Sequence, residues 1–308
     1  MSLDLAALGA AVAAHGRVVR VLIAGHRGSS PREAGASMLV WEGGQSGTIG
    51  GGALEWAAAA RARAMAAQAA PPRVERVPLG PALGQCCGGS VTLVYEAFCA
   101  ASLPRLTVRD GWAARPVEAG AAPHPPALRG RAGPRLTAGW LLEPLRPPGR
   151  PLWVWGAGHV GRAIVAMAAP LPDLAVTWVD TAPERFPEAV PDGVTVRVAA
   201  DPATLVPEAP REAEHLVLTH SHALDLALCH ALLRHGFAGA GLIGSASKWA
   251  RFRSRLAALG HAGEAIARLR CPIGEPGLGK HPQAIAVGVL AELLRAPAAQ
   301  ALPAVSAG

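Results

Sequence analysis

The sequence has no apolar run long enough to cross a bilayer (about 18 residues), although 51% of its 308 residues are hydrophobic and its mean hydropathy is +0.26. Charged residues interrupt the two most apolar stretches: Glu55 and Arg61 break the first, and Glu292 breaks the second. The sequence therefore predicts no membrane-spanning helix. Residues 1–4 also lack the basic character of a signal peptide, so we expect a cytoplasmic protein.

Aromatic residues and cysteines are also scarce. Aromatics make up 4% of the chain, and there are five cysteines, an odd number. In a cytoplasmic chain of this size, that count argues against a disulfide framework. The formal net charge of +7 comes almost entirely from arginine, but no basic run is interleaved with aromatic residues. We therefore expect no nucleic-acid partner. The same charge suits a protein that handles a phosphorylated small molecule.

The most informative feature that is present is a glycine triplet. An apolar strand over residues 153–155 runs into Gly156, Gly158 and Gly161, and a second strand ends at Asp180, 19 positions after Gly161. In dinucleotide-binding βαβ units these glycines allow a tight turn, a close phosphate and close helix packing. The carboxylate at the end of the second strand accepts a ribose hydroxyl. The pattern predicts a Rossmann-type domain with these four residues in its binding site.

Strands and helices alternate through the second half of the chain, which is typical of a parallel α/β sheet. We expect a Rossmann-like domain over residues 151–296 and an N-terminal α+β domain over residues 1–146. Residues 103–136 are dense in Pro, Gly, Ala and Arg without clear periodicity, which predicts a long mobile insertion. Residues 297–308 are expected to form a disordered tail.

Two glycine-rich turns in the N-terminal domain combine backbone donors, hydroxyls and charge. The second turn leads into a predicted helix, whose N-terminus favours an anion. The candidate binding residues in these turns are Ser30, Arg32, Gly50, Gly51, Gly52 and Glu55. Plain hairpin and cap chemistry explains the same residues, with Arg32 paired to Glu33 or Glu55.

Cys86 and Cys87 stand before two glycines. Adjacent Cα atoms lie about 3.8 Å apart, too close for an unstrained disulfide, so we interpret the pair as free thiols. A thiolate flanked by glycines is accessible and can act as a soft metal ligand. Two small apolar side chains in a tight turn are the alternative. The residues alone favour neither interpretation.

Further candidate ligand-binding residues come directly after the predicted strands in the second half of the chain. His220, His222 and Asp225 lie at the carboxyl end of one strand, where open α/β folds bind ligands. The His-x-His pair suggests zinc, but no third ligand stands at a fixed spacing. Lys248 begins a helix after a glycine- and serine-rich turn that suits a phosphate. We include His220 and Lys248 among the candidate cofactor-binding residues.

Taken together, these segments resemble the xanthine dehydrogenase accessory protein family (XdhC/CoxI) over nearly the whole chain. Each segment is weak evidence alone, but their order and spacing make the combination specific. The segments are GSSPR (28–32), GTIGGGALE (47–55), CGG (87–89), GAGHVG (156–161), THSHALD (219–225), IGSASK (243–248), PIG (272–274) and AIAVGVLAEL (284–293).

The resemblance implies a cytoplasmic chaperone for the molybdenum cofactor (Mo-molybdopterin). Such a protein binds the cofactor, holds it while a cysteine desulfurase supplies sulfur, and delivers it to the molybdenum subunit of apo-xanthine dehydrogenase. Cys87, the cysteine of the family motif, is then the residue expected to contact the metal. We expect no catalytic residues, no membrane association and a homo-oligomer.

The chain departs from the family pattern in three places. Some relatives carry a cysteine where this chain has Ala53, Cys86 is an additional thiol, and residues 103–136 have no counterpart. The glycine triplet and Asp180 alone would favour an NAD(P)-dependent oxidoreductase, and an adaptor that recruits a desulfurase without holding cofactor is a third hypothesis. The Rossmann cleft could hold a nucleotide, the pterin phosphate or nothing.

Overall fold

The structure is a computed structural model, and it describes residues 2–68, 70–80, 89–103, 106–126, 133–147 and 149–295. The chain divides into two compact units, residues 1–147 and 148–308. Cys86, Cys87 and the tail expected to be disordered (297–308) lie outside the described residues. Among the helices that the structure describes, none is long and apolar enough to cross a membrane.

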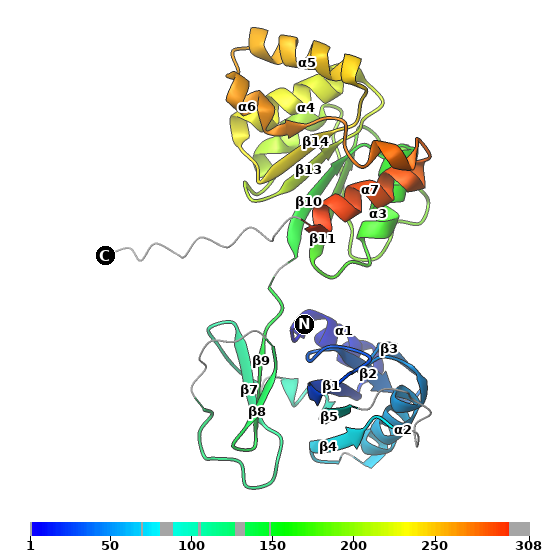
Figure 1. Ribbon diagram of the computed structural model, residues 1–308, viewed down its shortest axis with the longest axis vertical. Coiled ribbons are helices and arrows are strands. Elements are labelled where there is room, and N and C mark those ends of the chain that lie inside the picture. The colour runs from blue at the N-terminus through cyan, green and yellow to red at the C-terminus, as the bar shows by residue number, and fades with distance from the viewer. Residues whose placement is uncertain are drawn as a thin grey trace, which may run out of the picture. The chain divides into compact units, whose positions relative to one another are not determined.

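The first unit contains an antiparallel sheet of five strands in the order β3-β2-β1-β5-β4 (Figure 1). Its strands are β1 (Val18–Arg27), β2 (Ser37–Trp41), β3 (Gly44–Gly47), β4 (Arg73–Pro78) and β5 (Ser90–Phe98). Helix α1 (Leu5–His15) precedes the sheet, and helix α2 (Gly52–Gln68) packs on it. The small side chains of Ala58, Ala59 and Ala62 allow this close packing and are buried.

A second antiparallel sheet of the same unit has four strands in the order β6-β7-β9-β8. They are β6 (Thr107–Arg109), β7 (Trp112–Pro116), β8 (Arg135–Thr137) and β9 (Trp140–Pro144). The segment 103–136, which we expected to be a long mobile insertion, contains β6, β7 and the first residues of β8. Strands of three to five residues carry no readable periodicity. The turns do leave a signal: both residues of Asp110-Gly111 have positive φ, as a tight hairpin requires.

Four buried charged side chains link the two sheets of this unit. Arg20 on β1 lies 2.7 Å from Glu143 on β9. Arg115 on β7 lies 3.0 Å from Glu143 and 2.5 Å from Glu96 on β5. Burial would raise the pKa of Glu143, but Arg20 and Arg115 hold this pKa below its ordinary value. Two cations and two anions thus neutralise one another inside the unit.

The second unit is a six-stranded parallel sheet in the order β12-β11-β10-β13-β14-β15, which confirms the predicted Rossmann-like fold. Its strands are β10 (Arg150–Trp155), β11 (Leu174–Asp180), β12 (Thr195–Val198), β13 (Glu214–Val217), β14 (Gly239–Leu242) and β15 (Leu269–Arg270). Strand β15 was not expected from the sequence, because two residues carry no pattern.

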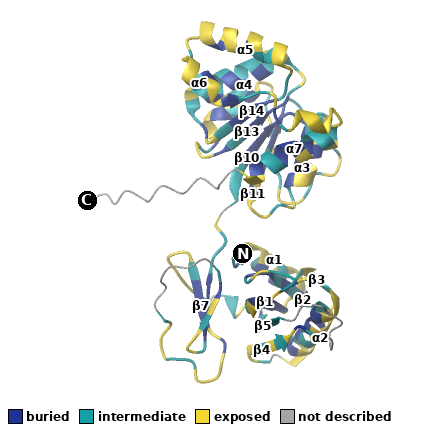
Figure 2. Ribbon diagram, viewed as in Figure 1, coloured by how far each residue is buried: buried dark blue, intermediate teal, exposed yellow. Residues whose placement is uncertain are grey.

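Helices cover both faces of this sheet. They are α3 (His159–Ala168), α4 (His222–His235), α5 (Ala246–Ala258), α6 (Gly263–Ala267) and α7 (Pro282–Arg295). Alternate residues of β10 point to opposite faces: Leu152 and Val154 join the core under α3 and α7, whereas Trp153 and Trp155 join the core under α4 and α5. Figure 2 shows buried strands between the helices and an exposed outer side on α5.

Candidate functional site

The turn between β10 and α3 carries the glycine triplet, and its three members have different surroundings. Gly156 has φ of +124°, and a Cβ there would overlap the carbonyl oxygen of Leu218. A Cβ on Gly161 would overlap the carbonyl oxygen of Gly156. Gly158, the N-cap of α3, has nothing within 4 Å of a Cβ position. Two glycines are therefore needed for packing, and the third leaves open space before the helix N-terminus.

Asp180 ends β11 beside this turn, at the position expected of a ribose acceptor. Its carboxylate accepts hydrogen bonds from the backbone N–H of Ala157 (2.5 Å) and Thr181 (2.6 Å), and from Nε of Arg185 (3.2 Å). Burial would raise the pKa of Asp180, but the hydrogen bonds from Ala157 and Thr181 keep this pKa below its ordinary value. The carboxylate thus holds the glycine turn in place, and a ribose would compete with these partners.

Asp225 was named with His220 and His222 in the sequence analysis but was not included among the cofactor-binding residues. It is fully buried on α4 and accepts from the backbone N–H of Thr219 (3.0 Å) and from its hydroxyl (2.7 Å). Lys248 lies 2.6 Å from the same carboxylate and also donates to the carbonyl of Ile243 (2.8 Å). The lysine charge is therefore neutralised within the protein. Asp225 ties together the ends of β13 and β14 and the start of α5.

The histidines at this edge were a candidate zinc pair in the sequence analysis. His220 is exposed in the connection between β13 and α4, and no described residue is hydrogen-bonded to its ring. Within the part of the chain that the structure describes, no group of three or more His, Cys, Asp or Glu side chains could hold a metal ion.

In the first unit, Glu55 organises the turn before α2. Its carboxylate accepts from the Thr48 hydroxyl (2.5 Å) and from the backbone N–H of Ile49 (2.9 Å) and Gly51 (3.1 Å). Burial would raise the pKa of Glu55, but these hydrogen bonds keep it below its ordinary value. Gly50, Gly51 and Gly52 all have positive φ. The Glu55 carboxylate therefore accepts from two backbone N–H groups, those of Ile49 and Gly51, in the turn that the sequence suggested as a site for a bound anion.

The structure brings the N-terminal candidate segments together. A Cβ on Gly50 would lie 2.6 Å from Pro31, and one on Gly89 would overlap the carbonyl oxygens of Arg27 and Ser29. The Ser30 hydroxyl donates to the Arg32 carbonyl (2.7 Å), and Arg32 Nε lies 3.4 Å from Glu33. Residues 28–32, residues 48–52 and Gly89 therefore form one cluster of close-packed turns.

Two family models match the chain: the XdhC Rossmann domain over residues 152–293, and the XdhC and CoxI family over residues 11–77. Together they cover about two thirds of the sequence. The chain belongs to the XdhC and CoxI family. The first match contains the glycine turn, Asp180, His220 and Lys248, and the second contains the candidate turns of the first unit. Cys87 lies outside both matched ranges.

Two known proteins extend the comparison. The uncharacterized protein YqeB of Escherichia coli K12 is 36% identical over 142 residues, which are 46% of this chain and 26% of YqeB. The chain thus spans about a quarter of the length of this curated relative. A crystal structure of a xanthine dehydrogenase from Bacillus halodurans is 21% identical with a TM-score of 0.70, covering 97% of this chain and 98% of that chain. This likeness shows a shared fold along nearly the whole chain.

Proposed function

We propose that this protein is a maturation factor for a xanthine dehydrogenase. It binds the molybdenum cofactor as cargo, holds it while a cysteine desulfurase supplies sulfur, and delivers it to the molybdenum subunit of the apo-enzyme. The observation that carries the proposal is the match to XdhC family models in both units. In this proposal the chain carries no catalytic residue, acts as a homo-oligomer and depends on the other two proteins as partners.

The cluster of turns in the first unit supports the binding of such a cargo. Molybdopterin combines a phosphate with a metal held by sulfur, so its carrier needs a cation and a soft ligand. The Arg32 side chain is 31% exposed at the cluster. Cys87 stands two positions before Gly89 in the sequence, and we assign it the role of soft ligand from its residue type and family motif.

The glycine turn supports the alternative, an NAD(P)-dependent oxidoreductase, because Gly158 leaves space for a phosphate at the start of α3. The geometry gives this alternative less support. The carboxylate that would accept the ribose, Asp180, is 2% exposed and already accepts hydrogen bonds from four protein groups.

The proposal is tested by the molybdenum content of the protein purified from a host that makes the cofactor. Wild type is expected to carry molybdenum and pterin. Cys87→Ala should carry far less of both, because a soft ligand is lost, whereas the neighbouring Cys86→Ala serves as the matched control and should load normally. Equal loading of all three proteins contradicts the assigned role of Cys87, and the absence of molybdenum from wild type contradicts the proposal itself.

A further inference from the structure

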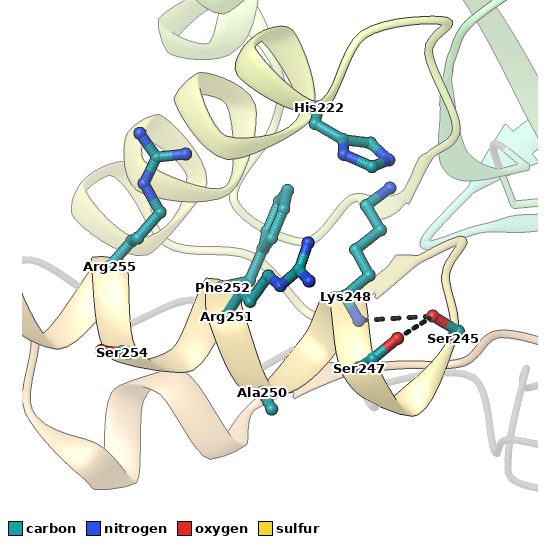
Figure 3. A pocket seen from close by; sticks show the side chains of 9 residues that line it. All are labelled: His222, Ser245, Ser247, Lys248, Ala250, Arg251, Phe252, Ser254 and Arg255. Atoms are coloured by element: carbon teal, nitrogen blue, oxygen red, sulfur yellow. Dashed lines mark hydrogen bonds between the residues drawn. The ribbon is translucent and has the colours of Figure 1, made fainter.

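A groove of about 660 Å³ runs along α5, from Ser245 to Arg255, and faces the start of α4. Figure 3 shows side chains of α5 extending toward α4, where His222 forms the opposite wall. Phe252 forms part of the groove and is 3% exposed. The volume falls within the range of small-molecule sites, about 300–1,000 Å³. Helix α5 comes directly after β14 in the chain. In the sheet, β13 lies between β14 and β10, so the groove is separate from the glycine turn after β10.

The groove is lined by cations without a matching carboxylate. Arg251 and Arg255 lie one turn apart on α5, and both are exposed. Neither guanidinium has an ion pair or hydrogen bond with any residue that the structure describes. Lys248 also lines the groove, but Asp225 neutralises it from the buried side. Two positive charges therefore face the groove unopposed, and a bound anion would be attracted by both.

Two hydroxyl groups that line the groove stand at the N-terminal end of α5. The oxygens of Ser245 and Ser247 are 2.9 Å apart, and the Ser245 oxygen accepts from the backbone N–H of Lys248 (3.3 Å). Ser245 can donate its proton to Ser247, which leaves the Ser247 proton for a ligand. The groove thus combines two guanidinium groups with a hydroxyl donor.

We propose that this groove binds the phosphate group of a small organic molecule, with Arg251 and Arg255 as its cations and Ser247 as a hydroxyl donor. Guanidinium groups match phosphate oxygens with paired hydrogen bonds. A concave site of this volume fits a phosphate and an attached organic part. An acidic protein surface would instead engage a flat or convex basic face. The inference is independent of the proposed function, since it rests on the side chains of α4 and α5 alone.

Titration of the full-length protein with inorganic pyrophosphate, followed by calorimetry, tests the proposal. Arg251→Ala and Arg255→Ala are each expected to raise the Kd about tenfold, because each removes a charged hydrogen-bond donor. Arg253→Ala is the matched control: Arg253 is exposed on the same helix but does not line the groove. Its Kd should stay within about twofold of wild type.

The position of the ligand is read from the NMR signals of the His222 ring, which should shift on addition of pyrophosphate. ADP distinguishes the sources of the phosphate: tighter binding than pyrophosphate identifies a nucleotide, and equal binding identifies another phosphate ester. The proposal is overturned if wild type does not bind pyrophosphate, if Arg253→Ala weakens binding as much as Arg251→Ala, or if the shifts occur at Gly156–Gly161 and not at His222.

Discussion

Gly158 and Gly161 stand three positions apart in one turn but constrain the protein differently. A Cβ on Gly161 would overlap backbone, whereas a Cβ on Gly158 would meet open space. Gly161→Ala is therefore expected to lower the free energy of unfolding by about 1–3 kcal/mol. Gly158→Val should keep the wild-type melting temperature, because φ at Gly158 is −72°, a value that any residue adopts. Thermal unfolding of the full-length variants measures both effects.

Gly158→Val also tests the turn as a ligand site. Its side chain would occupy the space that a phosphate needs before α3, so any phosphate ligand of this turn should bind more weakly. Calorimetry with NAD(P) and the content of molybdenum in the purified variant report on the two candidate ligands. Wild-type values for both ligands in a well-folded variant would place them elsewhere in the protein.

His215 on β13 predicts a pH dependence of stability. The ring is fully buried, its Nδ1 accepts from Trp155 (3.1 Å), and its Nε2 has no hydrogen-bond partner among the described residues. Burial, with a smaller contribution from His235, lowers the pKa of His215 to about 3 from 6.5. Below about pH 6.5 the unfolded chain takes up a proton that the folded protein excludes. Stability should therefore fall by about 1 kcal/mol per pH unit as the pH decreases from 6.5 toward 3.

The matched variant for this effect is His215→Asn, whose side-chain oxygen can still accept from Trp155 but does not titrate. Urea unfolding of both proteins between pH 7 and pH 5 gives the comparison. The loss of stability with decreasing pH should be smaller in the variant. Identical slopes in the two proteins would show that His215 is protonated equally in the folded and unfolded chains.

At the residue scale, the sequence predicts where the site residues lie in the fold better than it predicts their hydrogen-bond and ion-pair partners. The spacing of Gly156, Gly158, Gly161 and Asp180 is local, and the structure places all four at the first turn of the parallel sheet. The hydrogen bonds that Asp180 accepts from Ala157 and Arg185 depend on how neighbouring segments approach one another. The pairing of Lys248 with Asp225, 23 positions apart, is equally invisible in a one-dimensional pattern.

At the scale of elements, the buried charges between the two sheets of the first unit give a prediction. Arg115→Ala removes one cation and leaves Glu96 and Glu143 buried without it, so the free energy of unfolding should fall by about 3–5 kcal/mol. Arg109→Ala on β6 is the control, because its pair with Asp110 is exposed and should contribute less than about 1 kcal/mol. Equal urea midpoints for both variants would contradict a stabilising role for the buried cluster.

The four-stranded sheet of the first unit shows which strands could not be predicted from the sequence. The long strands and helices of the Rossmann unit carry apolar patterns, and the structure contains each expected alternation of strand and helix. Strands β6 to β8 are three to five residues long and are held by pairing with one another and with β9. Their stability comes from partners distant in sequence, so composition alone suggested an unstructured insertion.

At the scale of the whole molecule, the chain contains two units, each with its own candidate binding sites. The first contains the close-packed turns around residues 28–32, and the second contains the glycine turn and the groove of α5. The alternation of strands and helices predicted the parallel sheet of the second unit, because that pattern is local in the sequence.

The most direct test of the proposed function uses a strain that lacks this gene. Its xanthine dehydrogenase should assemble but contain cofactor without the sulfido ligand. Xanthine oxidation per assembled enzyme should therefore be lost, and the wild-type gene should restore it. Full xanthine-oxidising activity in the deletion strain would contradict the account.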